Sequence, residues 1–276
     1  MAIRFKAPAK INLCLHVLGQ RPNGFHILDG LVAFLDCGEW VELRKASKTT
    51  LQIIGPQSEK LPVAADNLVL RAADIFPAGC TTEILLHKTM PISSGIGGGS
   101  SNAAATLRGM SELWNIPSPN IAAQLSLGAD VPVCMWSKPV VMQGTGEVIS
   151  ELSYMPPLFA CLVNPARAVS TAMIFNQLES KSNSAMGVVP TCPLIFLDWL
   201  AQQRNDLQAP AVDVEPMIVA VLGELKAHNP RVSRMSGSGA TCFALFETLE
   251  AATSCAQVIN EAQPSWWTAS GPLIAS

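Results

Sequence analysis

The chain has 276 residues, with 18 Lys and Arg against 21 Asp and Glu, so its formal net charge is −3. Only 14% of the residues are charged and 49% are hydrophobic, which excludes a disordered protein, because disorder goes with low hydrophobicity and high net charge. The lack of a basic excess also argues against a nucleic-acid-binding protein, which neutralises phosphates with lysine and arginine.

The mean hydropathy of +0.30 raises the question of a membrane protein. A membrane-spanning helix needs about 20 consecutive apolar residues, but the strongest apolar run, at residues 218–222, ends at Gly223 and Glu224. Lys6 and Lys10 interrupt the N-terminal stretch, so we expect no secretory signal peptide.

The eight cysteines are scattered through the chain, and no two are separated by only two residues. Most lie inside apolar stretches, which is typical of reduced, buried thiols and not of a disulfide framework or a zinc site. We therefore expect a cytoplasmic protein with neither a membrane nor a nucleic acid among its partners.

Period-two alternation over residues 10–17 predicts a strand with one buried face. Its apolar face carries Ile11, Leu13, Leu15 and Val17, and its other face carries Lys10, Asn12, Cys14 and His16. A turn is expected at the Arg-Pro-Asn-Gly sequence of residues 21–24. Further strands are expected at residues 40–43, 51–54 and 82–86.

Helices are expected at residues 67–76, capped by Asp66, and at residues 101–114, after a glycine-rich loop. Ser118 and Pro119 predict the start of another helix. That helix should end at Gly128 in the left-handed conformation.

Two adjacent prolines near residue 155 mark the expected domain boundary, so we predict an N-terminal domain over residues 1–154 and a C-terminal domain over residues 155–276. The second half should contain strands at 159–163 and 267–274, a strand–turn–strand around 236–239, and helices at 171–177, 193–203, 216–228 and 248–262. This mixture predicts an α+β protein. Residues 178–192, rich in serine and asparagine, are either a mobile lid or plain surface.

The glycine-rich loop is the sharpest feature of the sequence. Four glycines in the five positions 95–99 let backbone N–H groups point inward, and the helix that follows has an N-terminal dipole that favours an anion. Ser100 and Ser101 add hydroxyl donors or a metal-facing oxygen. The pattern predicts a phosphate cradle, although it is neither a Walker A loop nor a dinucleotide fingerprint. A flexible glycine turn is the alternative.

Three other motifs are weaker taken singly. Lys10 and Asn12 project from one strand face, where a solvated lysine is the alternative. Asp130 follows a helix end, with Pro132 holding Val131 extended, and an ordinary turn aspartate is the alternative. The small-residue sequence at 235–240 is as well explained by a hairpin connection.

Together these motifs resemble the GHMP kinases, the superfamily of galactokinase, homoserine kinase, mevalonate kinase and phosphomevalonate kinase. The superfamily loop Pro-x-x-x-Gly-Leu-Gly-x-x-Ser-Ser is matched by residues 91–101, with Ile96 in the leucine position. The resemblance is strongest to the branch that phosphorylates the 2-hydroxyl of 4-diphosphocytidyl-2-C-methyl-D-erythritol in the non-mevalonate pathway of isoprenoid biosynthesis. The motifs that carry it, in order, lie at 8–13, 24–26, 66–68, 97–104, 127–132, 205–207 and 236–240, and so span nearly the whole chain.

The resemblance implies a two-domain fold. Its N-terminal domain would be similar to domain 2 of ribosomal protein S5, its C-terminal domain would be a ferredoxin-like α/β sandwich, and the active site would lie in the cleft between them. ATP and Mg²⁺ would be the cofactors, and the protein would be a monomer or weak homodimer.

The resemblance also implies a role for each matched residue. Asp130 would be the catalytic aspartate, which accepts the proton of the attacking hydroxyl or only orients that hydroxyl, and Lys10 would be its partner. The residues implied to bind ATP are Asn67, Lys88, Pro91, Ile92, Ser93, Ser94, Gly95, Ile96, Gly97, Gly98, Gly99, Ser100, Ser101, Gly237, Ser238 and Gly239. Those implied to bind the cytidyl substrate are Asn12, Phe25, His26, Thr171 and Phe175.

In this base pocket Phe25 would stack on the pyrimidine and His26 would hydrogen-bond its polar edge. Thr171 and Phe175, four residues apart on one helix face, would form the second wall. A structural histidine is the alternative for His26. Phe25 replaces a tyrosine that is usual in the family, so the clamp could be looser or differently built.

Two other functions are alternatives. The first is a kinase of the same superfamily that acts on homoserine or mevalonate, against which the Gly-Phe-His sequence at 24–26 argues, because those substrates offer no base to stack. The second is a non-catalytic ligand-binding protein on the same fold, which should have lost the pair Lys10 and Asp130.

Overall fold

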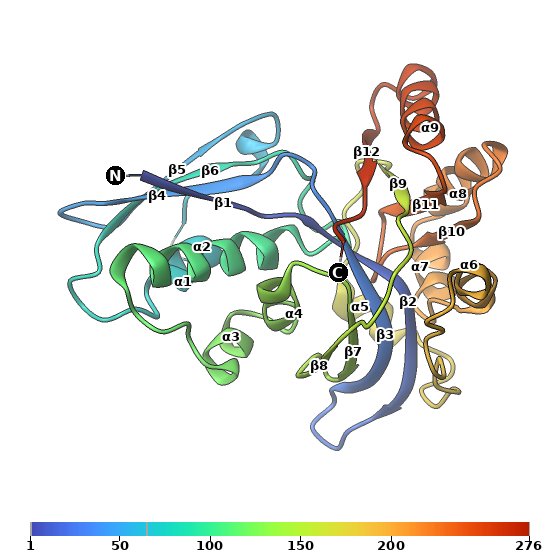
Figure 1. The fold of residues 1–276 in the computed structure, drawn as a ribbon, viewed down its shortest axis with the longest axis horizontal. Coiled ribbons are helices and arrows are strands. Elements are labelled where there is room, and N and C mark those ends of the chain that lie inside the picture. Colours follow the sequence, from blue (N-terminus) through green and yellow to red (C-terminus); the bar gives the residue numbers. More distant parts are fainter. Residues whose placement is uncertain (1, 65, 276) are drawn as a thin grey trace. The chain divides into compact units, whose positions relative to one another are not determined.

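A computed structural model describes residues 2–64 and 66–275 of the protein, and Figure 1 shows how helices and strands mix along the chain. The strands are β1 (Ala2–Lys6), β2 (Ala9–Gln20), β3 (His26–Leu35), β4 (Trp40–Lys45), β5 (Thr50–Ile54), β6 (Thr82–His87), β7 (Val140–Gly144), β8 (Val148–Glu151), β9 (Phe159–Asn164), β10 (Val232–Met235), β11 (Cys242–Phe246) and β12 (Trp267–Pro272). The helices are α1 (Leu68–Ala73), α2 (Gly98–Trp114), α3 (Ile121–Leu127), α4 (Val131–Trp136), α5 (Thr171–Asn176), α6 (Pro193–Gln202), α7 (Gln208–Val214), α8 (Met217–Ala227) and α9 (Leu249–Ala262).

The expected α+β class is confirmed. Within the described residues the strands form three four-stranded sheets, ordered β1-β4-β6-β5, β2-β3-β7-β8 and β10-β11-β9-β12. Among the elements of the described residues, seven had no counterpart in the sequence-based expectations: β1, β3, β7, β8, α4, α7 and the short 3₁₀ turn at Ser58–Lys60.

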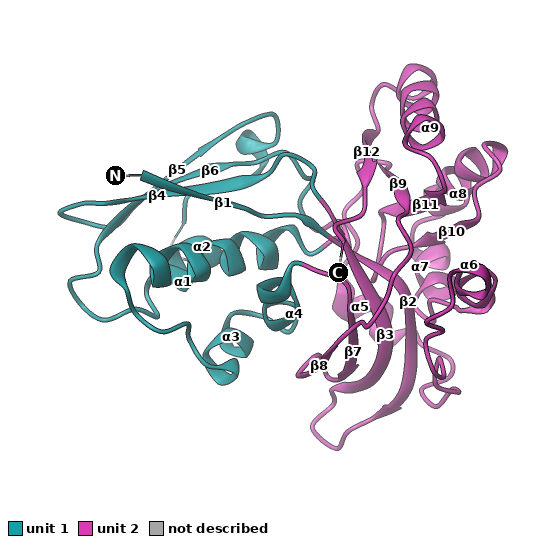
Figure 2. Ribbon diagram, viewed as in Figure 1, with its two compact units in different colours: residues 1–9, 36–92, 97–137 teal, residues 10–35, 93–96, 138–276 magenta. Residues whose placement is uncertain are grey.

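The chain divides into two compact units, drawn in different colours in Figure 2. Unit 1 takes its residues from 1–9, 36–92 and 97–137, and unit 2 takes its residues from 10–35, 93–96 and 138–276. The glycine-rich loop is therefore shared, since residues 93–96 pack with unit 2 and residues 97–99 with unit 1. The domain boundary at residue 154 stays a prediction.

Unit 1 is one sheet covered by helices. Its strands β1, β4 and β6 pair antiparallel and β5 pairs parallel with β6, while α2 contacts β1 and β4. Leu43 and Ile84 of the sheet and Ala103, Leu107 and Met110 of the helix are fully buried and belong to one apolar cluster. The apolar face expected for this helix is confirmed, although the helix begins three residues earlier, at Gly98.

Unit 2 contains the other two sheets, and its long strand β2 differs from expectation. The alternating sequence predicted one buried face, but residues 9–17 are buried on both faces. The polar face is covered by other segments of the same unit: Asn12 donates its backbone N–H to the Ser236 hydroxyl at 3.1 Å, and His16 hydrogen-bonds the Ser184 carbonyl at 3.1 Å. The burial of this face therefore comes from segments that lie far along the chain.

Two helix starts were placed wrongly by sequence. Asn67, not Asp66, caps α1, because its side-chain oxygen accepts from the Val69 N–H at 3.0 Å. Asn120, not Ser118, caps α3 in the same way. In both cases the capping residue is the asparagine whose oxygen reaches the second or third N–H of the helix.

The turn before α4 also differs from expectation. Val131 was expected to be extended, but it is the first residue of α4, and Pro132 lies in the first turn, where its missing N–H costs nothing. Gly128 does end α3 as expected, yet its φ of 164° is extended and not left-handed. Asp130 thereby occupies the N-cap position of α4.

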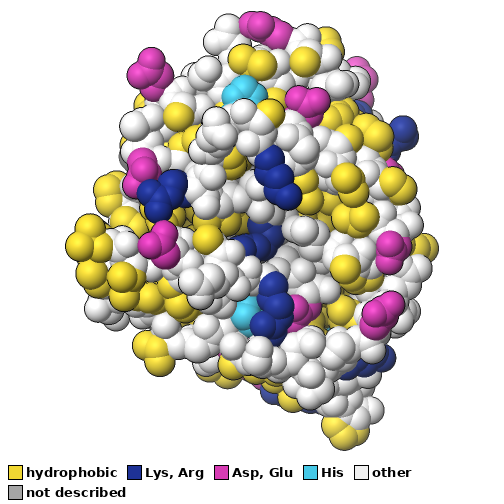
Figure 3. All heavy atoms as spheres, turned by 90° about the vertical axis from the view of Figure 1, so that its right-hand side faces the viewer, with side chains coloured by type: hydrophobic (Ala, Val, Ile, Leu, Met, Phe, Trp, Pro, Cys, Tyr) yellow, Lys and Arg dark blue, Asp and Glu magenta, His cyan; other side chains and the backbone are white. Residues whose placement is uncertain are grey.

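Charged side chains are sparse. On the face drawn in Figure 3, acidic and basic side chains are interspersed, with many hydrophobic and neutral side chains between them. With a net charge of −3, the protein cannot attract an anion by a broad positive field. Anion binding must therefore rest on a few placed groups. Within the described part of the chain, no helix has both the length and the apolarity required to cross a membrane.

Two helix glycines should respond oppositely to alanine. In α2, a Cβ on Gly109 would lie 2.4 Å from Leu43 Cδ1 and 3.1 Å from Phe5 Cδ2, and Leu43 is fully buried. We expect Gly109→Ala to lower the free energy of unfolding by about 1–2 kcal/mol, because overpacking exceeds the gain in helix propensity.

The matched control is Gly223→Ala in α8, where a Cβ would meet nothing within 4 Å. This variant should raise the free energy of unfolding by about 0.5–1 kcal/mol. Urea unfolding of both variants measures the difference, and a stabilised Gly109→Ala would contradict the close packing of α2 on β4.

Candidate functional site

Two small-residue loops that are far apart in sequence meet within unit 2. Gly95 has a φ of +76°, and a Cβ there would lie 2.5 Å from the Ser236 carbonyl oxygen and 2.7 Å from that of Gly239. The Ser236 hydroxyl donates to the Gly95 carbonyl at 3.1 Å, and the Thr241 N–H donates to the Ser94 carbonyl at 3.2 Å. Only glycine fits this backbone contact, for both its conformation and its lack of a side chain.

The first residues of β2 join the same cluster. The Lys10 N–H donates to the Ile96 carbonyl at 2.9 Å, and Asn12 reaches Ser236 through its backbone. The Asn12 side chain is 1% exposed, and neither its Oδ1 nor its Nδ2 has a hydrogen-bond partner among the described residues. Buried amides are nearly always paired, so this orphaned carboxamide marks a position where a ligand would supply the partners.

Asn205 holds the second small-residue loop in place. Its Nδ2 donates to the carbonyls of Met235 and Gly237, both at 2.8 Å. Asn205 lies in the matched motif at residues 205–207, but no role for it was implied there. From the sequence alone, an asparagine that follows a helix could cap that helix or anchor a distant loop, and nothing in its neighbours distinguishes the two roles.

In unit 1, the glycines lead directly into α2. Gly97 is left-handed, with a φ of +62°, and is the N-cap of the helix. The backbone N–H groups of the first helical turn have no acceptor within the helix, and the helix dipole adds partial positive charge there. The glycine-rich entry to the 17-residue α2 is as expected, and anion binding at this helix end stays a prediction.

The two serines of this loop differ. Ser101 is fully buried, and its hydroxyl donates to the Pro8 carbonyl at 2.7 Å, which fixes the first turn of α2. Ser100 is half-buried, and its Oγ lies 3.8 Å from the position that a Cβ on Gly128 would take. Of the pair, Ser100 is the one whose hydroxyl faces the turn that leads to Asp130.

Lys88 is engaged in a buried ion pair. Its Nζ lies 2.8 and 2.9 Å from the two carboxylate oxygens of Glu39, and the two side chains are 2% and 0% exposed. Glu39 also accepts the N–H groups of Thr89 and Met90. A Cβ on Gly98 would lie 3.3 Å from the Lys88 Nζ, so the pair sits directly beneath the start of α2.

This pairing changes what Lys88 can do. Its ammonium is already balanced by Glu39, so a structural role beneath the loop is evident, and a direct contact with nucleotide stays a prediction. Glu39 was missed by sequence, because a single acidic residue far from the loop in the chain gives no signal of its partner. Asn67 is likewise occupied, since its side-chain oxygen caps α1.

The predicted catalytic residues belong to different units. Lys10 is 4% exposed in unit 2, and Asp130 is half-buried in unit 1. Their partnership stays a prediction.

His26 and Phe175 form a stacked pair in unit 2. Their ring centroids are 4.7 Å apart and their planes are 24° from parallel. The His26 Nε2 is buried and has no hydrogen-bond partner among the described residues. Burial and the nearby positive charge of Lys181 lower the pKa of His26, which favours a neutral ring. Phe25, in contrast, is 59% exposed.

Helix α5 connects this aromatic pair to the glycine loops. Its first residue, Thr171, shares a hydrogen bond of 2.8 Å between its hydroxyl and that of Ser238. Its fifth residue is Phe175. The structure therefore brings together Thr171, Phe175, His26 and Ser238, which the sequence had assigned to two different ligands.

Metal ligands are few. Among the described residues, no group of three or more His, Cys, Asp or Glu side chains is placed to hold a metal ion. A cavity of about 240 Å³ in unit 2, lined by β7, β8 and residues 186–191, contains none of the predicted site residues.

Comparison with known proteins places these features in a family. Residues 67–138 match the GHMP kinases N terminal domain, and residues 194–264 match the GHMP kinases C terminal domain. The chain is 44% identical over 281 residues to a 4-diphosphocytidyl-2-C-methyl-D-erythritol kinase of Ruegeria pomeroyi, covering 99% of this chain and 100% of that protein.

Two solved structures are similar over nearly the full length. A crystal structure of 4-(cytidine 5'-diphospho)-2C-methyl-D-erythritol kinase is 28% identical with a TM-score of 0.81, covering 99% of this chain and 100% of that one. A homoserine kinase from Cytophaga hutchinsonii is 18% identical with a TM-score of 0.72, covering 99% and 95%, and so shares the fold. The chain therefore belongs to the GHMP kinases and, within them, to the family of 4-diphosphocytidyl-2-C-methyl-D-erythritol kinases.

Proposed function

We propose that this protein is an ATP-dependent kinase that phosphorylates the 2-hydroxyl of 4-diphosphocytidyl-2-C-methyl-D-erythritol, giving the 2-phosphate and ADP. The observation that carries the proposal is the stacked pair of His26 and Phe175, with the His26 Nε2 buried and unpaired. Flat rings beside an unsatisfied polar atom suit a nucleobase. Homoserine and mevalonate have no such group, so this pair favours a cytidyl substrate over the substrates of the related kinases.

The phosphates of ATP are bound by backbone N–H groups of the glycine-rich loop and the first turn of α2. This assignment is supported by the left-handed Gly97 at the N-cap of a 17-residue helix and by the low charge of the chain. Gly237 and Gly239, in the second small-residue loop, are assigned to the same ligand. Both have positive φ values, of +55° and +87°, a conformation in which backbone N–H groups can line an anion-binding concavity. The Gly239 N–H itself donates to the Ser236 carbonyl at 3.1 Å.

Magnesium fits the donor set of unit 1. Mg²⁺ prefers oxygen ligands and is usually held by one or two protein groups together with substrate phosphates and water. The Ser100 hydroxyl and the Asp130 carboxylate are the two oxygen donors proposed for it. Ser101 is unsuited, because its hydroxyl is committed to the Pro8 carbonyl. The ion, when bound, would neutralise charge on the phosphates.

Catalysis is assigned to Asp130 and Lys10. Asp130 accepts the proton of the attacking hydroxyl or orients that hydroxyl, and Lys10 stabilises negative charge on the reacting groups. Phosphoryl transfer depends chiefly on positioning and charge stabilisation. Lys10 is held through its backbone by Ile96 in the glycine-rich loop, which supports a role close to the transferred group.

The proposed function is tested by measuring ADP release with four alcohols. The purified protein is supplied with ATP, Mg²⁺ and either 4-diphosphocytidyl-2-C-methyl-D-erythritol, homoserine, mevalonate or galactose. We expect turnover with the cytidyl compound alone. Preferential turnover of another alcohol would show a different member of the superfamily, and binding of ATP without any turnover would favour a non-catalytic protein.

Asp130→Asn should retain ATP binding and lose turnover by about two to four orders of magnitude, because the amide cannot accept the proton of the hydroxyl. Calorimetry measures ATP binding, and the coupled ADP-release assay measures turnover. Asp213→Asn, at an exposed position of α7, is the matched control and should behave as wild type. Near-normal activity of Asp130→Asn would show that the catalytic assignment is wrong.

His26→Ala should raise the KM for the cytidyl substrate about tenfold and leave the KM for ATP unchanged. His26 would contribute one hydrogen bond and a stacking surface to recognition of the base. Because such a contact stabilises the bound substrate and the transition state equally, its loss raises KM and leaves kcat unchanged. Steady-state kinetics with each substrate varied in turn measure both constants, with His228→Ala at the end of α8 as control. An unchanged KM for the cytidyl substrate would contradict the base pocket.

A further inference from the structure

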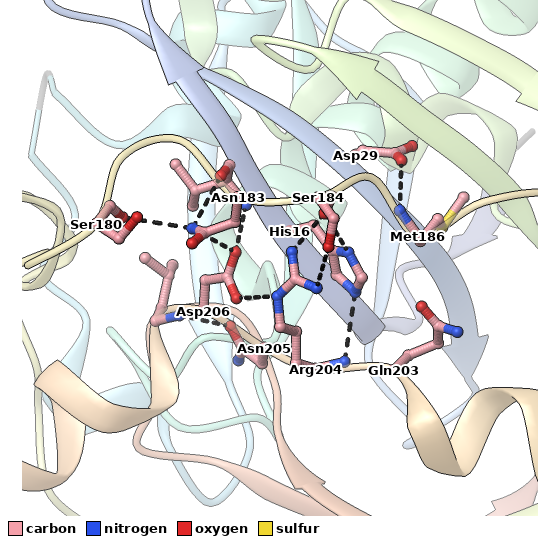
Figure 4. Close-up of polar contacts among 12 residues, drawn as sticks. His16, Asp29, Ser180, Asn183, Ser184, Met186, Gln203, Arg204, Asn205 and Asp206 are labelled. Atoms are coloured by element: carbon pink, nitrogen blue, oxygen red, sulfur yellow. Dashed lines mark hydrogen bonds and ion pairs between the residues drawn. The ribbon is translucent and has the colours of Figure 1, made fainter.

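Residues 180–187, here called the strap, are bonded across the polar face of β2 (Figure 4). The backbone N–H and the side-chain Nδ2 of Asn183 both donate to the Val17 carbonyl at 3.1 Å. The His16 Nδ1 lies 3.1 Å from the Ser184 carbonyl oxygen. The sequence left this region open as either a mobile lid or plain surface, and these bonds fix its middle in one place.

Two charged residues after α6 complete this attachment, as Figure 4 shows. Arg204 donates its backbone N–H to the His16 Nε2 at 3.3 Å and its Nε to Asp206 at 2.6 Å. Asp206 in turn accepts the Val17 N–H at 2.7 Å and the Asn183 Nδ2 at 3.1 Å. His16 can satisfy both of its contacts only as a neutral ring with the proton on Nδ1. Burial and the positive charge of Arg204 lower the pKa of His16, which also favours the neutral ring.

The far end of the strap is fixed to β3. The Met186 N–H donates to Asp29 Oδ2 at 2.9 Å, and the other oxygen of Asp29 accepts from Gln143 of β7 at 3.0 Å. Asp29 is 3% exposed. The strap is thus anchored over two strands of the sheet, and a side chain that it carries is held at a defined position.

Lys181 is the cation that the strap carries. Its Nζ donates to Gln20 Oε1 at 3.2 Å, and Gln20 Nε2 donates to the Gly24 carbonyl at 2.9 Å. Gly24 belongs to the turn that leads to Phe25 and His26. The charge of Lys181 acts on His26, whose pKa it helps to lower.

The ammonium of Lys181 is not balanced by a carboxylate. Its Nζ contacts a neutral amide, and no ion pair involves it among the described residues. Arg21, the cation of the turn at residues 21–24, forms an ion pair with Glu147 at 2.6 Å. In a chain that carries few charges, an unbalanced cation beside the pocket proposed for a base calls for an anionic partner.

We propose that Lys181 binds the diphosphate of the cytidyl substrate, so that the strap supplies the charge recognition that accompanies base recognition by His26. This inference rests on the proposed function. In a nucleoside diphosphate the phosphates follow the base by one ribose, which suits a cation placed next to the base pocket and not within it. A lysine ammonium is a compact donor suited to phosphate. No sequence pattern pointed to Lys181, because its position depends on the hydrogen bonds that hold the strap to β2 and β3.

The experiment compares the binding of CDP and cytidine, by calorimetry without ATP, to wild type, Lys181→Met, Lys181→Arg and the control Lys226→Met. Lys226 is exposed in the last turn of α8. We expect Lys181→Met to weaken CDP about tenfold and to leave cytidine unchanged, because one charge-assisted contact is lost. Lys181→Arg should retain most of the affinity for CDP, and Lys226→Met should match wild type.

The outcomes separate this proposal from the proposed function. If wild type binds CDP more tightly than cytidine and Lys181→Met binds CDP equally well, Lys181 is a solvated surface lysine and the proposal is overturned. Equal weakening of CDP and cytidine would also overturn it, since Lys181 would then shape the base pocket. If wild type binds neither compound, the proposed function itself fails, and the proposal falls with it.

A second measurement tests the placement of Lys181 without any ligand. In Lys181→Met the pKa of His26, followed by NMR of its ring protons, should rise relative to wild type, because a positive charge that disfavours the imidazolium has been removed. Lys226→Met should leave that titration unchanged. An unaltered His26 pKa in Lys181→Met would overturn the proposed placement of Lys181 beside the pocket.

Discussion

The backbone contact between Gly95 and residues 236–239 is the constraint on which the rest of unit 2 depends. It allows no side chain at Gly95, and it is held by the Ser236 hydroxyl and by Thr241. Around it gather the first residues of β2 and the first residue of α5. The segments that we propose to bind the substrate and the nucleotide are distant in sequence and are positioned by main-chain packing. Such packing tolerates less rearrangement than contacts between flexible side chains.

The scarcity of charge shapes how ions are used. In unit 1 a lysine directly beneath the start of α2 is balanced by Glu39, whose carboxylate receives four hydrogen bonds. Removing one partner of such a buried pair typically costs about 3–5 kcal/mol, because the other charge is stranded. The ion pair therefore supports the glycine-rich loop, and its charges are not exposed to solvent. Lys181, on the strap, differs from Lys88, because no carboxylate balances its charge among the described residues.

The sequence predicted those features that depend on local patterns. The α+β class, the glycine-rich entry to α2, its apolar face and the hairpin around residues 236–239 follow from periodicity and from the conformational freedom of glycine. The alternating pattern of β2 also identified a strand. The expectation that the polar face of that strand would be exposed was wrong, because segments from far along the chain pack on it and bury Asn12 and His16.

The remaining site residues could not be read from local patterns for the same reason. Glu39 meets its lysine partner only because β4 and β6 pair, and Asn205 anchors a loop some 30 residues away. Caps were misplaced by one or two residues where a second suitable polar residue lies within two positions, as with Asp66 and Asn67 or Ser118 and Asn120. Strand β3 was missed because its buried run follows directly from the turn at 21–24.

Helix α5 is only six residues long, yet it is bonded to Ser238 through its first residue and stacked on His26 through its fifth. A single short helix cannot shift at one end and stay fixed at the other, so the two contacts move together. If occupation of one loop alters the affinity at the aromatic pair, thermodynamic reciprocity requires the reverse effect of equal size. The order in which the two substrates are bound would then matter to the rate of assembly but not to the stability of the ternary complex.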